Sequence, residues 1–361
     1  MNKDAKIVFL MMSILLMVGV VMIYSSSALY AHDASGDSLH FVKRHLVYLA
    51  AGIIVAVLCM SVPVGKVQHS AKAILAISII LLLVVLIPGV GKQVGGARRW
   101  LRFLGFGFQP SELAKLAVII YIADLTSRKR YLIRNLKYGF LPPLVVTGVV
   151  GALVLLEPDM GTSVSILFIG MVMMFAAGAR ALHLAAITAG IIPVLVLAVI
   201  CAPYRMRRIL TFFDPWKDPR GAGFQLIQSF IALGSGGIIG VGLGASKHKL
   251  FFLPESHTDF IFSIIGEELG FLGTAAVLLV FAIMIWFCMR LSFRIKEEFS
   301  SRVVLGITIM IAFEVIVNIG VSTGVLPTKG LPLPFISYGG SSLVAHMAAM
   351  GLVFNMSRNA E

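Results

Sequence analysis

The chain has 361 residues, of which 58% are hydrophobic and only 13% are charged, and its formal net charge is +13. Soluble domains are about 45–50% apolar and about 25% charged, so this composition excludes an ordinary soluble enzyme. The cations lie in the connections between apolar segments, which also excludes a nucleic-acid-binding domain and makes anionic lipid head groups the expected partner. The three cysteines lie singly in or beside apolar runs, without metal-ligand spacing: Cys59, Cys201 and Cys288.

Apolar segments long enough to cross a bilayer recur along the chain and predict an all-α integral membrane protein with ten transmembrane helices. The first runs from Ile7 to about Ile23; it exceeds the core of a signal peptide, about 7–15 residues, so we interpret it as a retained span. The other nine are expected near 46–62, 71–88, 111–125, 140–156, 162–179, 183–202, 260–289, 302–325 and 340–356.

Basic residues in the short loops favour cytoplasmic N- and C-termini. Residues 1–361 then form a single polytopic domain, and 203–259 becomes a large extracytoplasmic loop that we expect to carry the site. Basic residues are unusually frequent in two outer connections, 89–110 and 203–259. We infer that both meet an anion at the outer face; the alternative is contact with anionic outer-leaflet lipid.

The first of these connections contains Arg98, Arg99 and Trp100, and its aromatic residues favour an interfacial segment lying on the membrane. The next helix is expected to start near Pro110, capped by Gln109 or Ser111. Glu112 and Lys115 follow, three residues apart, which fits a local ion pair. Because an ionisable group inside a span is costly, Lys115 is also a candidate to reach a phosphate, or a carboxylate on another span.

Glu157 to Thr162 is predicted to be a tight outer hairpin. Its two carboxylates, Glu157 and Asp159, fit helix capping as well as they fit binding of a cation or a sugar. In the long outer segment, six glycines crowd residues 234–244 and would let backbone N–H groups approach an anion. This run matches no nucleotide-binding motif.

The stretch from Leu253 to Leu269 runs from this segment into an apolar helix. Ser256 and Asp259 have the spacing of a capping box, in which Ser256 caps the helix and Asp259 returns the bond. A carboxylate at the mouth of a membrane helix, with cations upstream, also suits chemistry on an anionic lipid, and the two interpretations do not exclude each other. Other candidate substrate-binding residues along the chain are Glu112, Lys249, His257, Glu267 and Ser337.

Towards the end of the chain, residues 327–341 resemble a re-entrant outer turn that enters the last helix, and Ser337 lies within it. Glu314 and Asn318 lie within the preceding span, and Glu314 is expected to hydrogen-bond to another helix. His346 is expected to form an interhelical bond rather than bind a metal, because no second histidine has suitable spacing.

Five motifs in this order resemble the SEDS family of bacterial shape, elongation, division and sporulation proteins: Gly96–Trp100, Gln109–Lys115, Glu157–Thr162, Leu253–Gly270 and Leu333–Ser341. The resemblance covers nearly the whole chain. Asp214–Trp216 and His257–Phe260 are more similar to the division branch, or to its sporulation relative, than to the elongation branch.

The resemblance implies a peptidoglycan glycosyltransferase that polymerises lipid II at the outer face of the cytoplasmic membrane, beside a class B penicillin-binding protein and other division proteins. The family's essential aspartate corresponds to Asp259, which we expect to act as general base on the acceptor sugar. The family's arginine and lysine correspond to Arg98 or Arg99, and Lys115; these would hold the pyrophosphate. A divalent cation such as Mg²⁺ is a further candidate for that task.

Two other functions use the same features. A transporter that flips lipid-linked precursors would need outer cations and intramembrane acids, but it predicts inverted repeats with paired broken helices, and the sequence shows no convincing internal repeat. A non-catalytic division scaffold would not explain the excess of cations in the outer connections.

Overall fold

The computed structural model describes residues 2–94, 97–103, 106–128, 133–246 and 257–359. Lys249 and Ser256 therefore lie outside the described residues. The α-helices are α1 (Lys3–Ser35), α2 (His40–Ser61), α3 (Val64–His69), α4 (Ala71–Leu86), α5 (Pro110–Arg128), α6 (Leu141–Leu156), α7 (Met160–Ala176), α8 (Ala181–Ile200), α9 (Pro203–Phe213), α10 (Phe224–Gly236), α11 (Ile261–Arg294), α12 (Glu298–Ser322) and α13 (Gly340–Met356). Short helical turns complete them: η2 (Leu136–Phe140), η3 (Pro215–Lys217) and η4 (Ser357–Asn359).

The predicted all-α membrane architecture is confirmed, and a helix covers each of the ten predicted segments. Among the described residues, six helices are long and apolar enough to cross a bilayer: Lys3–Asp33, His40–Ser61, Leu136–Leu156, Ala181–Ile200, Ile261–Arg294 and Glu298–Ser322. The apolar helices α4, α7 and α13 are shorter, and α5 carries charges near both ends. Ten crossings are therefore still a prediction.

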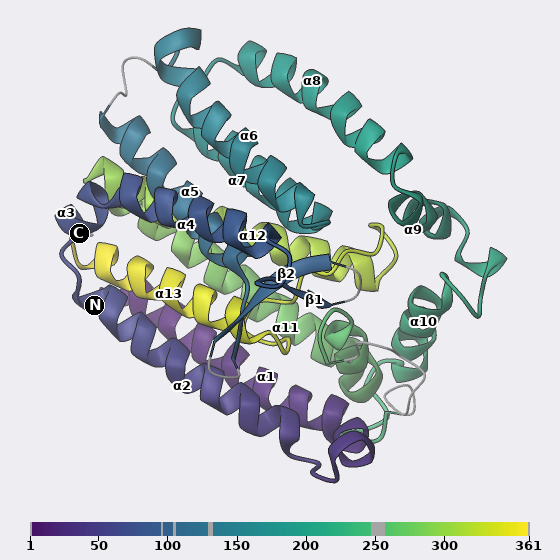
Figure 1. Ribbon diagram of the computed structural model, residues 1–361. Helices are drawn as coiled ribbons and strands as arrows, with labels where there is room; N and C mark the ends of the chain where they lie inside the picture. Colours follow the sequence, from purple (N-terminus) through teal and green to yellow (C-terminus); the bar gives the residue numbers. More distant parts are fainter. Residues whose placement is uncertain (1, 95–96, 104–105, 129–132, 247–256, 360–361) are drawn as a thin grey trace.

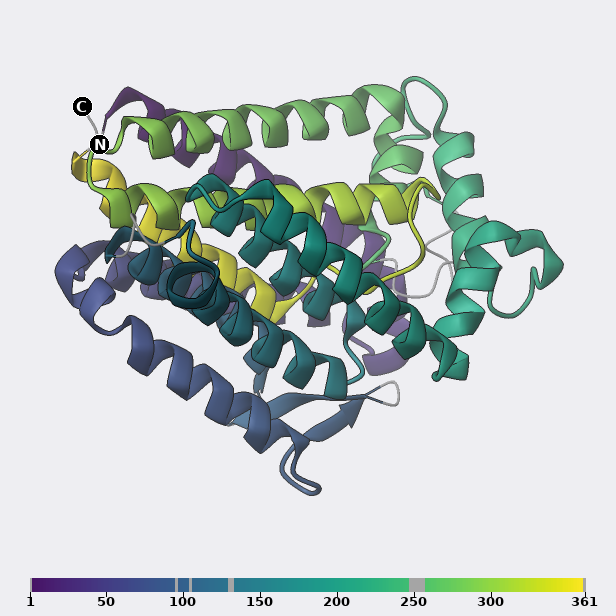
Figure 2. The ribbon, with the colours of Figure 1, turned by 90° about the horizontal axis from the view of Figure 1, so that it is seen from above.

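The long helices form one bundle, with both chain termini at one end and α9 and α10 at the other (Figures 1 and 2). Helix α12 lies at its centre and packs against α5, α7, α11 and α13. In its apolar 18-residue stretch, 67% is buried inside the protein. Helix α8 lies at the margin of the bundle (Figure 1), and only 6% of its apolar 18-residue stretch is buried inside the protein. The predicted orientation places the end with α9 and α10 outside the cell.

The connection between α4 and α5 forms a small antiparallel sheet of β1 (Lys92–Val94), β2 (Ala97–Phe103) and β3 (Phe106–Phe108), in the order β1-β2-β3. The sequence suggested an irregular interfacial segment here. Two side chains join the sheet to the bundle: the Tyr48 hydroxyl accepts from Gly107 N at 3.2 Å, and the Ser341 hydroxyl donates to Gly107 O at 3.0 Å. The sheet therefore has a fixed position over α2 and α13.

Helix α11 is broken at Gly270, whose φ of 67° and ψ of −166° are a conformation that in practice only glycine adopts. The segment 237–242 fills the break with four backbone hydrogen bonds, from Val241 N and Gly242 N to Glu267 O and Glu268 O, and from Phe271 N and Leu272 N to Gly237 O and Ile238 O. Backbone groups that a broken helix would leave unpaired are thus satisfied. The glycines allow this segment to pack closely against the backbone of α11. A Cβ atom added at Gly240 would lie only 2.2 Å from Glu268 O, which is too close.

We expect Gly270→Ala to lower the free energy of unfolding by about 2–5 kcal/mol, combining backbone strain with overpacking. The added methyl would lie 2.3 Å from Gly240 N and 2.5 Å from Ile238 O. The matched control is Gly148→Ala in α6, where nothing lies within 4 Å of the new methyl. Thermal unfolding in detergent measures both, and equal stability of the two variants would contradict this account of the break.

Helix α11 begins at Ile261 with Phe260 at the N-cap, and no side-chain hydrogen bond caps it among the described residues. The predicted capping box between Ser256 and Asp259 involves a residue outside the described part of the chain, so it is still a prediction. By contrast, Asp159 does cap α7: its Oδ1 accepts from Thr162 N at 3.1 Å, as one of the two predicted roles requires.

Candidate functional site

Asp259 lies half-buried in the turn 257–260 at the predicted outer end of the bundle. Its carbonyl oxygen accepts from Asn318 Nδ2 of α12 at 3.0 Å, and the same amide nitrogen donates to Leu331 O at 2.9 Å. The Asp259 carboxylate lies against the backbone of Gly330, where an added Cβ would be 3.2 Å from Oδ2. Asn318 thus joins the turn to the 327–339 segment and fixes where this carboxylate points.

Ser337 and His257, two predicted substrate-binding residues, also hold this turn. The Ser337 hydroxyl donates to Thr258 O at 2.6 Å and accepts from Leu333 N at 2.8 Å. The backbone of His257 accepts from Tyr338 N at 2.9 Å, and its ring lies 4.7 Å from that of Phe41 between centroids. Both residues therefore have structural contacts, and their contact with substrate is still a prediction.

The pairing of β1 with β2 is irregular around the two arginines: Gln93 pairs with Arg98 and Lys92 with Trp100, which leaves Arg99 at a β-bulge. Arg99 reaches the α6–α7 hairpin: its Nε and Nη2 donate to Glu157 O at 3.2 Å and Pro158 O at 2.5 Å, and its Nη1 lies 3.8 Å from the Asp159 carboxylate. The sequence left the choice between the two arginines open, and these contacts distinguish Arg99 from Arg98.

Glu157 lies under this hairpin, fully buried, and neither oxygen of its carboxyl has a hydrogen-bond partner in the described structure. Burial, with the charge of Asp159 adding to it, raises the pKa of Glu157 to about 8, against the opposing effect of Arg99. The group is therefore mostly protonated at neutral pH, which does not suit the predicted cation-binding role.

This raised pKa predicts a pH dependence of stability. Folded Glu157 keeps its proton up to pH of about 8, whereas in the unfolded chain it loses the proton near its ordinary pKa of 4.5, so the free energy of unfolding should fall as pH rises between these values. Glu157→Gln should remove this part of the slope. Unfolding of both proteins at pH 5 and pH 8 provides the comparison, and parallel pH profiles would show that the carboxyl is ionised in the fold.

Lys115 lies inside the bundle, with only 2% of its side chain exposed. Its ammonium forms ion pairs with Glu112 at 3.0 Å and with Glu314 of α12. The second Glu314 oxygen lies 2.5 Å from Nε2 of His346 on α13. The predicted ion pair, the predicted carboxylate partner on another span and the interhelical role of His346 are all present. Because two carboxylates enclose the Lys115 ammonium, the geometry favours a role in positioning α5, α12 and α13.

Glu267 and Glu268 are buried at the break in α11. Ser246 donates to the Glu267 carboxylate, and Ser25 of α1 donates to both oxygens of Glu268 at 2.6 and 2.7 Å. These contacts attach the glycine-rich segment and α1 to α11. Contact of Glu267 with substrate is still a prediction.

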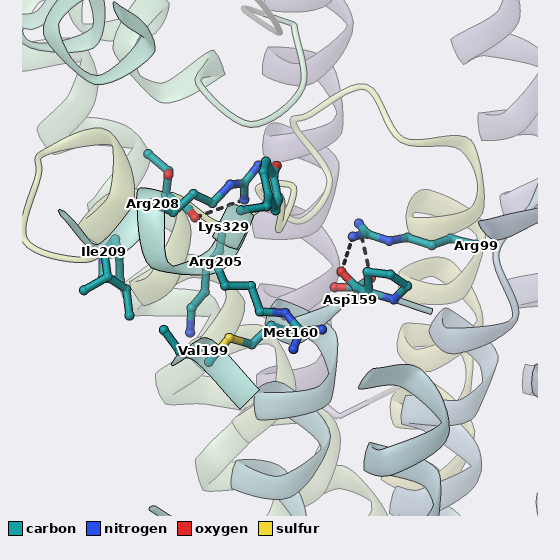
Figure 3. A pocket seen from close by; sticks show the side chains of 14 residues that line it. Arg99, Asp159, Met160, Val199, Arg205, Arg208, Ile209 and Lys329 are labelled. Atoms are coloured by element: carbon teal, nitrogen blue, oxygen red, sulfur yellow. Dashed lines mark hydrogen bonds and ion pairs between the residues drawn. The ribbon is translucent and has the colours of Figure 1, made fainter. Parts of the chain in front are cut away.

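Figure 3 shows a small pocket of about 140 Å³. One of its lining residues is Gly330, whose backbone lies next to the Asp259 carboxylate. We call this cavity the outer cationic pocket. Residues 327–330 line it, together with four cations and one carboxylate: Arg99, Arg205, Arg208, Lys329 and Asp159. Both α9 arginines that line the pocket are held by neutral oxygens: Arg205 donates to Ala198 O at 2.9 Å, and Arg208 donates to Thr328 O at 3.1 Å.

A second, much larger cavity lies within the bundle, and we call it the apolar groove. It measures about 780 Å³ and runs between α2, α4, α5 and α13, with walls that include Val47, Val84, Leu116 and Val344. At one end it shares Tyr48, Arg102 and Gly107 with a second cavity of about 260 Å³, the groove mouth, which adds Arg44, Lys92, Trp100, Thr258 and Tyr338. An apolar channel thus leads to cations and aromatic rings, one residue from Asp259.

Sequence reasoning did not single out several residues of these cavities. Arg44 and Lys329 were not among the predicted site residues, and the fold brings them into the cavities near the turn. No group of three or more His, Cys, Asp or Glu in the described parts of the chain could hold a metal ion. A divalent cation held together with the substrate's phosphates is still a prediction.

Comparison with known proteins places this geometry in context. A family model described as cell cycle protein, covering FtsW, RodA and SpoVE, matches residues 5–361. The chain is 42% identical to a probable peptidoglycan glycosyltransferase FtsW of Trichlorobacter lovleyi, covering 97% of this chain and 92% of the relative. It is also 42% identical to stage V sporulation protein E of Bacillus subtilis, covering 96% and 94%.

A solved structure is similar over its whole length. It is a chain from a study of the structural coordination of polymerization and crosslinking by a peptidoglycan synthase complex. The TM-score is 0.79 at 30% sequence identity, covering 97% of this chain and 96% of that chain.

Proposed function

We propose that this chain, which belongs to the family of FtsW, RodA and SpoVE cell cycle proteins and is a peptidoglycan glycosyltransferase, polymerises lipid II at the outer face of the cytoplasmic membrane during division. One observation carries the choice of substrate: the apolar groove and the groove mouth meet beside the Asp259 turn. An apolar channel suits a polyprenyl chain, the cations Arg44, Lys92 and Arg102 suit a pyrophosphate, and Trp100 and Tyr48 suit a sugar face.

In the proposed reaction Asp259 acts as general base. Its carboxylate accepts the proton of the acceptor sugar's 4-hydroxyl while that oxygen attacks the anomeric carbon of the donor sugar. The bond from the anomeric carbon to the pyrophosphate oxygen breaks, and the polyprenyl pyrophosphate leaves with the electron pair. A single displacement inverts the anomeric carbon, so an α-linked donor gives a β-linked strand.

The protein's contribution is positioning and charge stabilisation. The hydrogen bonds of Asn318 and Ser337 hold the turn that carries Asp259, so the base does not have to be oriented during the reaction. Arginine and lysine side chains at the groove mouth would stabilise the charge that develops on the leaving pyrophosphate. Arg98 belongs to the same strand, β2, and is proposed to contribute to the field that attracts the pyrophosphate.

The partner is proposed to be a class B penicillin-binding protein at the division septum, with other division proteins nearby. Support comes from the similar chain of a synthase complex that coordinates polymerization and crosslinking. A glycosyltransferase of this kind makes strands that a transpeptidase must join, so association of the two activities follows from the chemistry.

The test is polymerisation of purified lipid II by the purified chain, with and without a transpeptidase-inactive penicillin-binding protein. Gel separation of labelled glycan strands should show products longer than the disaccharide unit. If the folded protein binds lipid II but makes no strands under either condition, and instead moves lipid II across vesicle membranes, the precursor-transporter alternative is correct. If the protein produces no strands and moves no lipid II, the result favours the scaffold alternative.

A further inference from the structure

We propose that the outer cationic pocket binds a second pyrophosphate group, carried by the other lipid-linked substrate, at a place separate from the groove mouth. The inference rests on the proposed function, because a polymerase must hold two lipid-linked substrates at once: the growing strand and the incoming unit. Only one of the two can occupy the apolar groove. The charge and position of the outer cationic pocket, in the described structure, match the pyrophosphate of the other substrate.

The first argument is charge. Arg99, Arg205, Arg208 and Lys329 face a single carboxylate, Asp159, which also caps α7 (Figure 3). The carbonyl oxygens that hold Arg205 and Arg208 orient the guanidinium groups without neutralising them. Because four half-buried cations outnumber the one carboxylate, binding of an anion between them is favourable. Guanidinium groups also match the geometry of phosphate oxygens.

Lys329 provides a second argument. Its side chain lines the pocket, and no hydrogen bond or ion pair joins it to another residue in the described parts of the chain. Desolvation lowers the pKa of this amine, because no carboxylate compensates the burial. An ammonium placed in a pocket without a counter-ion on the protein indicates that the counter-ion comes with a ligand.

Size and position identify the group. About 140 Å³ is small beside the roughly 300–1,000 Å³ of pockets that enclose whole small molecules, so the pocket fits a phosphate-sized group rather than a disaccharide. Thr328, Lys329 and Gly330 line the pocket, and Gly330 also touches the Asp259 carboxylate. The groove mouth is lined by Thr258, the residue before Asp259. A pyrophosphate in each cavity would place the attached sugars near the same carboxylate.

The experiment measures the accessibility of Lys329 directly. Purified Asp259→Asn protein, in which no turnover is expected, is treated with a limiting amine-reactive reagent, and labelling of each lysine is quantified by mass spectrometry. Inorganic pyrophosphate should reduce labelling of Lys329 several-fold and leave that of the exposed Lys217 unchanged. Arg208→Gln should abolish this protection, whereas Arg207→Gln, on the same helix but exposed and outside the pocket, should preserve it.

Further arms separate other sources of the anion. Undecaprenyl pyrophosphate should protect Lys329 at lower concentration than inorganic pyrophosphate does, and phosphatidylglycerol nanodiscs should protect no better than phosphatidylcholine nanodiscs. Equal protection by phosphatidylglycerol would make the pocket a phospholipid site and overturn the proposal. Absence of protection by pyrophosphate, or protection only by a penicillin-binding protein, would overturn it as well.

Activity gives an independent readout in the Asp259-containing protein. Lys329→Met should raise the KM for lipid II or slow strand synthesis at least several-fold, while Arg207→Gln should match the parent. Because the labelling is done without turnover, its outcome does not depend on whether Asp259 is the base. A failure of the proposed function and a failure of this inference can therefore be told apart.

Discussion

Asp259→Asn should abolish strand synthesis, with a loss in rate of roughly 10²–10⁴-fold, the contribution of one general base. The amide has nearly the same shape and keeps the backbone bond from Asn318, but it cannot accept the hydroxyl proton. The fold should be unaffected, because the turn is held through backbone oxygens of Thr258 and Asp259. The measurement is the initial rate of lipid II polymerisation at saturating substrate, together with the unfolding temperature.

Asp33→Asn is the matched control, since Asp33 is an exposed acid at the same predicted outer face and lines none of the cavities described above. It should polymerise at the parental rate. A folded Asp259→Asn protein that is equally fast would remove Asp259 from the role of base. A variant that has lost both activity and its unfolding transition would instead assign the residue to folding.

Lys115→Met should be the most destabilising of the substitutions considered, costing about 3–5 kcal/mol of unfolding free energy, because removing one partner leaves uncompensated buried charge. Glu112 and Glu314 are 4% and 1% exposed, and both face the Lys115 ammonium. Methionine is close to the lysine stem in length, so lost packing contributes little. Equilibrium unfolding in mixed detergent micelles measures the change.

Two further variants make this result specific. Adding Glu314→Gln to Lys115→Met should recover part of the stability, since it removes one of the carboxylates left without a cation. Lys43→Met breaks the 2.8 Å pair with Asp37 on the surface, where 65% and 41% of the two side chains are exposed, and should change stability little. Equal losses for Lys43→Met and Lys115→Met would show that the buried charges are not coupled.

The membrane architecture could be predicted from the sequence because hydropathy acts residue by residue. Apolar runs located a helix at each predicted segment, and the spacing of Glu112 and Lys115 predicted their ion pair. The α6–α7 hairpin and its capping Asp159 also follow from local turn chemistry.

The arrangement around Asp259 could not be predicted in the same way, because it depends on contacts between distant segments. Asn318 holds a turn 59 residues earlier in the chain, and Ser337 holds one 79 residues earlier. The same contacts hold the turn to α12 and to the 327–339 segment, neither of which is adjacent to it in the sequence. Lys329 has no local signal, and its meaning comes from the arginines of α9 across the pocket.

The break in α11 also constrains the order in which the protein is assembled. Residues 237–242 leave the ribosome before α11 does, yet Val241 and Gly242 donate to carbonyls of Glu267 and Glu268, which belong to that later helix. The outer segment therefore cannot complete its backbone pairing until α11 has entered the membrane. During biogenesis these amides must be exposed to water on the far side of the bilayer, where exposure costs little, and not within the lipid, where each unpaired group costs several kcal/mol.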